Sequence, residues 1–235
     1  MNFFSKASIT GLMFVSTAVF AAEPAEGWYA GFMLGPSYTP NINRNITINN
    51  PIITSTLPGR LSYDILGNLG IQFGFRCNKF RYEGELNYNY NTFDKLKLGG
   101  FELTTDPNLV GLSMKGYTGI GSALFNAYYE FYDEEYSATK FVPYIGLGIG
   151  YAQLNSSLNL YFNGTQLNRT TRTRSADAPV AQGILGINYF FTDNVSLGTD
   201  FRYLTTNNIK AYNDSRVSYA SWNLVMNFSF DKPSY

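Results

Sequence analysis

The sequence of 235 residues contains no histidine and only one cysteine, Cys77. Histidine nitrogen and cysteine sulfur are ligands that zinc prefers, so their scarcity argues against a zinc site. A serine nucleophile would need lysine or aspartate as its base, and no serine, lysine and aspartate are spaced to suggest this. A lone cysteine cannot form a disulfide within the chain. We therefore expect no enzyme activity and no cofactor.

Long apolar runs are also missing beyond the N-terminus. Lys6 followed by an apolar stretch at 9–20 and small residues before Ala22 predicts a secretory signal peptide over residues 1–21. Its apolar core is too short to span a bilayer, which takes about 20 residues. Residues 22–235 then form one domain without a spanning helix, and such a chain enters a membrane only as a closed barrel.

Charge is scarce and balanced, whereas aromatic residues are abundant. Charged residues make up 14% of the chain, and the net charge is zero. The sequence has no cluster of basic residues of the kind that would suggest nucleic-acid binding. Phenylalanine, tyrosine and tryptophan make up 17%. Tyrosine at strand ends is typical of the interfacial girdles of membrane barrels, although a soluble β protein can carry as much.

Residues 80–90, FRYEGELNYNY, alternate apolar with polar side chains. A period of two predicts a strand with one apolar and one polar face. In a soluble barrel the apolar face lines the core, but in a membrane barrel it meets lipid and the polar face lines the lumen. The alternation alone fits both arrangements.

Eight such strands are predicted, and their connections decide between these arrangements. The predicted strands are 28–38, 65–77, 80–93, 116–131, 141–154, 180–191, 195–205 and 218–230. Short turns at 77–79, 132–140 and 192–194 alternate with longer polar connections at 39–64, 94–115, 155–179 and 206–217. This rhythm is typical of an all-β, eight-stranded, antiparallel up-and-down transmembrane β-barrel, with periplasmic turns and four extracellular loops.

The polar face carries charges that would lie in a narrow lumen. A charge there is costly unless it is paired, so we expect an ion-paired network. A gate for small ions or a proton-sensitive plug is the functional alternative to a structural polar core. Glycines 146, 148 and 150 form an inward column that is expected to leave room for large side chains of the opposite wall. The predicted network comprises Arg76, Arg81, Glu83, Glu85, Glu130, Asp200 and Arg202.

Two charged segments lie in connections. The acidic run 133–135 could attract a divalent cation weakly, but such a run is more often a solvated turn, and no metal site is predicted. Arg169, Arg172 and Arg174 make the third long loop basic. They could meet anionic sugars of lipopolysaccharide or of host surfaces, or could simply be solvated.

Three segments carry a family resemblance: VPYIGLGIGY at 142–151, QGILGINYFFTDNVSLGTDFRY at 182–203, and the last strand, which ends at Phe230. They resemble the small eight-stranded outer-membrane β-barrels of Gram-negative bacteria, the OmpA-like and opacity or surface-antigen group. The resemblance implies a monomer in the cell outer membrane, surrounded by lipid and lipopolysaccharide. It also implies that the barrel assembly machinery recognises a terminal aromatic residue, which here is Phe230 or Tyr235. The enzymes known on such small barrels need a catalytic histidine, which this chain lacks.

The expected function is a surface-antigen, adhesion or envelope role carried by the four loops, which could bind host surface ligands. One alternative is a small channel for ions or apolar solutes. Another, if the polarity is reversed, is a periplasmic ligand-binding β-barrel.

Overall fold

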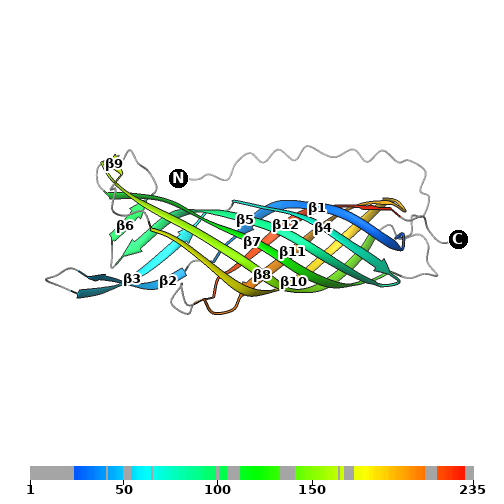
Figure 1. Ribbon diagram of the computed structural model, residues 1–235. Coiled ribbons are helices and arrows are strands. Elements are labelled where there is room, and N and C mark those ends of the chain that lie inside the picture. Colours follow the sequence, from blue (N-terminus) through cyan, green and yellow to red (C-terminus); the bar gives the residue numbers. More distant parts are fainter. Residues whose placement is uncertain are drawn as a thin grey trace.

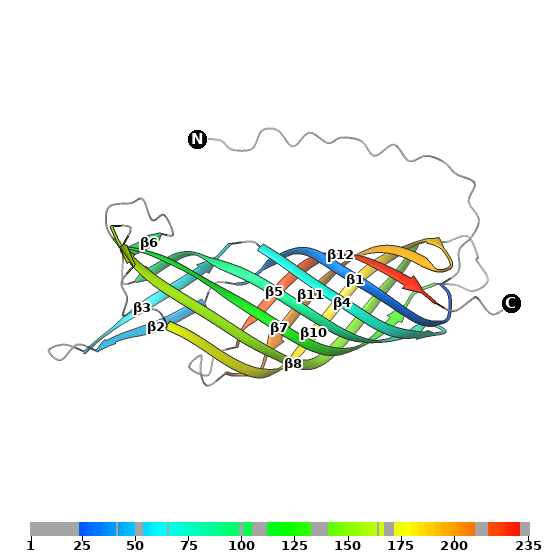
Figure 2. The ribbon, with the colours of Figure 1, turned by 45° about the horizontal axis from the view of Figure 1, so that its top comes forward.

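A computed structural model describes residues 24–40, 42–49, 54–64, 66–98, 101–104, 112–132, 141–163, 165–166, 172–209 and 216–230. Eight antiparallel strands follow one another around a closed barrel, and pairing of the first with the last completes the ring (Figures 1 and 2). The fold class is therefore the expected one. The barrel strands are β1 (Gly27–Tyr38), β4 (Leu66–Cys77), β5 (Phe80–Leu98), β7 (Leu112–Glu130), β8 (Phe141–Phe162), β10 (Arg172–Thr192), β11 (Val195–Thr206) and β12 (Ser218–Ser229).

Four shorter strands lie at one end of the barrel, on the left in Figure 1. β2 (Ile42–Asn49) and β3 (Thr54–Tyr63) form a hairpin that joins the end of β5. β6 (Phe101–Thr104) also pairs with β5, and β9 (Thr165–Gln166) pairs with β8. Within the described ranges, no helix is long and apolar enough to cross a membrane.

Several barrel strands are longer than predicted, because their pairing continues into segments that were expected to be loops. β8 continues to Phe162 instead of ending at 154, and β10 begins at Arg172 instead of 180. β5 extends to Leu98 and β7 starts at Leu112. Backbone groups alone make a β ladder, so polar side chains on both faces do not end a strand that has a paired neighbour.

Tight turns close the opposite end of the barrel. Asn78, between β4 and β5, has φ 50°, a left-handed conformation that asparagine adopts more readily than most residues. Thr192 caps the turn between β10 and β11 by accepting a hydrogen bond from the Val195 backbone N–H (3.1 Å). The end with these turns is called the turn end, and the end with β2, β3, β6 and β9 the loop end.

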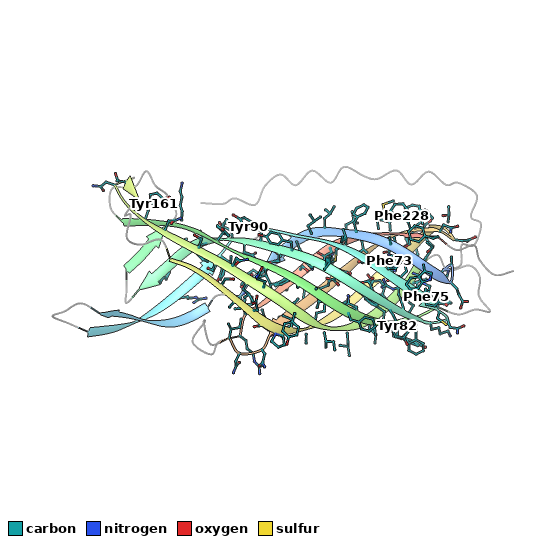
Figure 3. All side chains as sticks on the ribbon, in the orientation of Figure 1. Phe73, Phe75, Tyr82, Tyr90, Tyr161 and Phe228 are labelled. Carbon is teal, nitrogen blue, oxygen red and sulfur yellow. The ribbon has the colours of Figure 1, made fainter. Side chains whose placement is uncertain are left out.

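The outer surface is apolar and carries aromatic residues toward both ends (Figure 3). Near the turn end, Trp28 stacks on Phe73 with ring centroids 5.1 Å apart, and Phe141 contacts Tyr189 at 4.9 Å. Toward the loop end, Tyr90 lies beside Tyr117 at 5.4 Å. Between these zones the wall consists of exposed aliphatic side chains such as Leu69, Ile71, Ile145, Leu147 and Leu185.

The inward glycines make room for rings, but not in the expected manner. A Cβ atom at Gly146 would overlap the ring of Tyr128, its direct partner on the neighbouring strand. A Cβ at Gly186 would overlap Tyr144, likewise its direct partner. The expectation of side chains from the opposite wall was therefore wrong for Gly146, and Gly186 shows the same arrangement. In a barrel this narrow, each tyrosine lies over the adjacent strand instead of reaching across the lumen.

Candidate functional site

The charged lumen begins at the turn end with one carboxylate shared by two guanidinium groups. Arg76 and Arg81 face each other across β4 and β5. Arg76 Nε donates a hydrogen bond to Glu130 Oε2 (2.8 Å), and Arg81 Nε lies 3.0 Å from Glu130 Oε1. Arg76 Nη1 also donates to the carbonyl oxygen of Ala25 (3.2 Å). Glu130 thus offsets the repulsion between two cations that the strand register places side by side.

Glu83 is held by four donors in the middle of the barrel. Tyr29 and Tyr128 each donate a hydroxyl to one of its oxygens (2.7 Å). Arg81 Nη1 donates to Oε2 (2.9 Å) and Asn126 Nδ2 to Oε1 (3.1 Å). The Arg81 guanidinium carbon lies 3.8 Å from the centroid of the Tyr128 ring, a cation–π contact.

The third part of the network surrounds Arg202. Its Nε and Nη2 both donate to Asp200 Oδ2 (2.9 and 2.8 Å), and Nη1 donates to Glu85 Oε2 (2.5 Å). Gln182 and Asn126 also donate to Glu85, and Asn223 donates to Asp200 (2.9 Å). Because Asn126 donates to both Glu83 and Glu85, it joins this part to the middle one.

The seven residues singled out in the sequence therefore lie in one continuous chain of contacts. None is more than 2% exposed. The network contains three guanidinium groups and four carboxylates on β4, β5, β7 and β11. Its ion pairs form two groups, which the amide of Asn126 joins. Breaking a buried pair leaves an uncompensated charge, so each member depends on its partners.

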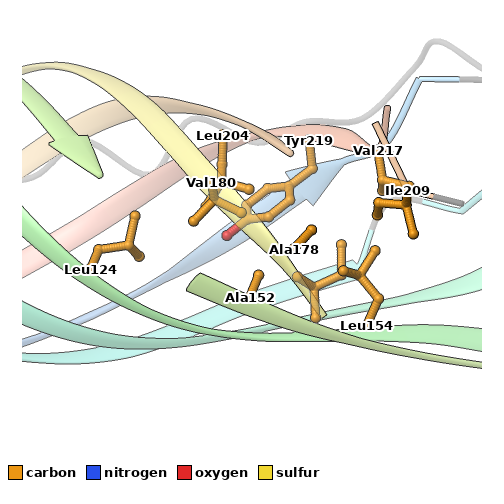
Figure 4. Close-up of a cluster of buried hydrophobic side chains, with 10 residues drawn as sticks. Leu124, Ala152, Leu154, Ala178, Val180, Leu204, Ile209, Val217 and Tyr219 are labelled. Carbon is orange, nitrogen blue, oxygen red and sulfur yellow. The ribbon is translucent and has the colours of Figure 1, made fainter. Parts of the chain in front are cut away.

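Above the charged network, the lumen contains a cluster of apolar side chains, which we call the apolar plug (Figure 4). The sequence predicts a polar lumen, and this cluster was not predicted. Leu204 belongs to it and shares the inward face of β11 with Asp200 and Arg202. Ile209 and Val217, from the connection predicted as a loop, are also buried there. The plug consists of Ile120, Leu124, Ala152, Leu154, Ala178, Val180, Leu204, Ile209, Val217 and Tyr219.

Other sequence candidates are only partly described. The acidic run 133–135, Arg169 and Tyr235 lie outside the described residues, as do the side chains of Arg172 and Arg174. Phe230 follows β12 with its side chain exposed, and its backbone N–H donates to the carbonyl oxygen of Trp28 (2.9 Å). Within the described part of the chain, no three His, Cys, Asp or Glu residues gather as a metal site would require.

The model of the outer membrane protein beta-barrel domain family matches residues 7–230. The chain belongs to this family. It is 26% identical over 195 residues to the outer membrane protein PagN of Salmonella typhimurium, and the match covers 80% of this chain and 78% of PagN. Among solved structures, OprG of Pseudomonas aeruginosa aligns with a TM-score of 0.55 at 13% identity, covering 91% of this chain and all of OprG. Ail of Yersinia pestis, solved with the heparin analogue sucrose octasulfate, aligns with a TM-score of 0.43 at 12% identity, covering 86% of this chain and 99% of Ail.

Family membership places the protein in the outer membrane and assigns the apolar wall to lipid. The alternative of a periplasmic ligand-binding barrel is not favoured. In bacterial barrels the short turns face the periplasm, so the loop end faces the cell exterior. The charged network then occupies the periplasmic and central lumen, and the apolar plug lies toward the exterior.

Proposed function

We propose that this protein is a surface adhesin whose binding surface is the β structure that projects at the loop end. The observation that carries the proposal is the length of β8. Its outward face changes from Ile149 and Tyr151 to Gln153 and Asn155, which marks the edge of the membrane. The strand continues from Asn155 to Phe162, about 23 Å along its length at the rise of a β-strand. Such a paired extension is a rigid base for the loops that it carries. Binding function commonly lies on loops held in this way.

The projecting part carries exposed cations. Arg60 on β3 lies opposite Lys97 on β5, and Lys95 is two residues away. On its other side, Lys97 is opposite Glu102 of β6 in the backbone register. Positive surfaces attract anionic polymers, and we propose acidic or sulfated surface sugars as the partner class. The similarity to PagN supports a role at the cell surface without naming a ligand.

Charge reversal tests this proposal on whole cells. We expect bacteria that display Lys95→Glu/Lys97→Glu to bind about tenfold less to heparin-coated surfaces than cells with the unchanged protein. Lys79→Glu, at the turn end, is the matched control and should leave binding unchanged. The result that would reject an anionic sugar as the partner is equal binding by the unchanged protein, the double variant and the control. The comparison is made at equal surface amounts of heat-modifiable protein.

We also propose that the charged network is a structural core and not a gate. Each carboxylate oxygen of Glu83 and Asp200 accepts at least one hydrogen bond, so a conducting state would have to break several buried bonds at once. The side chains of the apolar plug would also have to move away from one another. Among the described residues, opening a channel would therefore cost several buried contacts, and we favour the structural core.

A further inference from the structure

The charges of the lumen cancel in one group of ion pairs but not in the other. In the group at the turn end, two guanidinium groups face two carboxylates. In the second group, Arg202 is the cation for both Glu85 and Asp200. Among the described residues, all buried charges belong to these two groups. The second group therefore carries one negative charge in excess, and a buried charge is costly unless a counter-charge lies beside it.

Three buried oxygen atoms near Glu85 have no hydrogen-bond partner among the described residues. Asn87 donates its amide N–H to Glu85 Oε1 (3.1 Å), but its own Oδ1 has no donor. Ser122 of β7 is the direct partner of Asn87, and its Oγ is also without a partner. The unpartnered hydroxyl of Tyr219 comes from β12 on the opposite wall and lies near Ser122 and Glu85. In Figure 4 it points toward Leu124, the direct partner of Glu85.

These oxygen atoms are enclosed, because the three side chains are no more than 6% exposed. Carboxylate, amide carbonyl and hydroxyl oxygens are the ligands that hard cations prefer. A bound proton would also supply a counter-charge, but it does not suit the hydrogen bonds. Both oxygens of Glu85 and both oxygens of Asp200 already accept from donors, so a proton on any of them would displace one. A proton would also leave most of the unpartnered oxygens as they are.

We propose that the lumen binds one monovalent cation of the size of sodium beside Glu85. The neutral oxygens of Asn87, Ser122 and Tyr219 are its further ligands. A single positive charge cancels the excess, whereas a divalent ion would reverse it. Such a site uses one carboxylate, and thus differs from metal centres built by several acidic or imidazole side chains. The cation holds the second group of ion pairs together inside the barrel, and this inference is independent of the proposed adhesive surface.

The dependence of unfolding on sodium is the direct test. The protein is folded in zwitterionic lipid vesicles and unfolded with urea in sodium chloride or in choline chloride at equal concentration. Heat-modifiable gel migration measures the folded fraction. Choline is too bulky to be surrounded by these oxygens, and a ligand that binds only the folded state stabilises it by mass action. We expect the equilibrium constant of unfolding to be about tenfold lower in sodium than in choline.

Three variants locate the effect. Ser122→Ala removes one ligand without changing a charge and should abolish the difference between the two salts. Ser196→Ala makes the same change at a buried serine near the turn end, whose Oγ accepts from Asn227 (3.5 Å), and should keep the difference. Asp200→Asn removes the excess charge while leaving the four ligands in place, and should also abolish it.

Two results would overturn the proposal. The first is equal unfolding of the unchanged protein in the two salts, and a stability that then rises as the pH falls would assign the counter-charge to a proton. The second is a sodium effect of the same size in the Ser122→Ala and Ser196→Ala variants, because sodium would then act at another place.

Discussion

At the scale of single residues, Glu130 tests how far the buried charges depend on one another. It contacts both Arg76 and Arg81, which the register places opposite each other. Glu130→Gln removes the charge that separates them and should lower the free energy of unfolding by about 3–5 kcal/mol. Urea unfolding in lipid vesicles, followed by heat-modifiable gel migration, measures this loss. Lys79→Gln, on the half-buried turn position between β4 and β5, is the control, and a loss of equal size there would contradict the argument.

A second residue-scale prediction concerns the rings that lie over glycines. Gly146→Ala places a methyl group against Tyr128, whose hydroxyl is fixed by its bond to Glu83. Overpacking of this kind costs about 1–3 kcal/mol. Gly183→Ala adds the same group where nothing lies within contact distance, and should leave the unfolding midpoint unchanged. If both variants unfold alike, steric crowding at Gly146 is not the reason for the glycine.

At the scale of elements, the strand extensions make a prediction that separates them from loops. Asn155, Ser156 and Ser157 of β8 pair with both β7 and β10. Their backbone amides should exchange hydrogen far more slowly than those of an unpaired loop. Hydrogen exchange followed by mass spectrometry of the peptide 152–160 measures this, with the turn at 192–194 as the reference. Exchange as fast as in the reference would remove the rigid base from the proposed adhesive surface.

The same elements show what the sequence can and cannot predict. The barrel strands were predictable because lipid on one side and a charged lumen on the other impose a period of two, as in residues 80–90. The extension of β8 was not predictable, because Asn155 and Ser157 on the outward face and Ser156 on the inward face are all polar and carry no apolar signal. The seven charged residues were found by parity alone. The apolar plug was missed because a segment such as 180–187 has apolar side chains on both faces.

At the scale of the whole molecule, the filled lumen predicts a barrel that does not conduct. The charged network occupies the centre, and the apolar plug lies beside the buried amides of Asn87, Asn89 and Asn91 in the outward part. Among the described residues, a hydrated ion would therefore have to displace several buried contacts. We expect no stable unitary currents when the purified protein is added to planar bilayers. A larger porin inserted in parallel is the positive control. Reproducible single-channel steps that scale with the amount of folded protein would contradict this expectation.

Assembly of the molecule gives a further prediction. Phe230 is exposed at the end of β12, and we propose that it, and not Tyr235, is the terminal aromatic signal. Phe230→Ala should therefore reduce the amount of heat-modifiable protein in the outer membrane several-fold, whereas Tyr235→Ala should not. Gel analysis of outer-membrane fractions measures both. The opposite ranking would assign the signal to Tyr235.

The pairing of β1 with β12 sets the order in which the barrel can form. Trp28 and Phe230 are bonded neighbours although roughly 200 residues separate them, so closing this seam has the largest loop-closure cost of the ring. The edge of β1 must stay unpaired until the last strand arrives, and an open edge invites wrong partners. The seam is also interrupted at Gly35 and Pro36, where the ladder to β12 pauses. This pairing is therefore the last to form when the barrel closes. It is also where strand separation would begin.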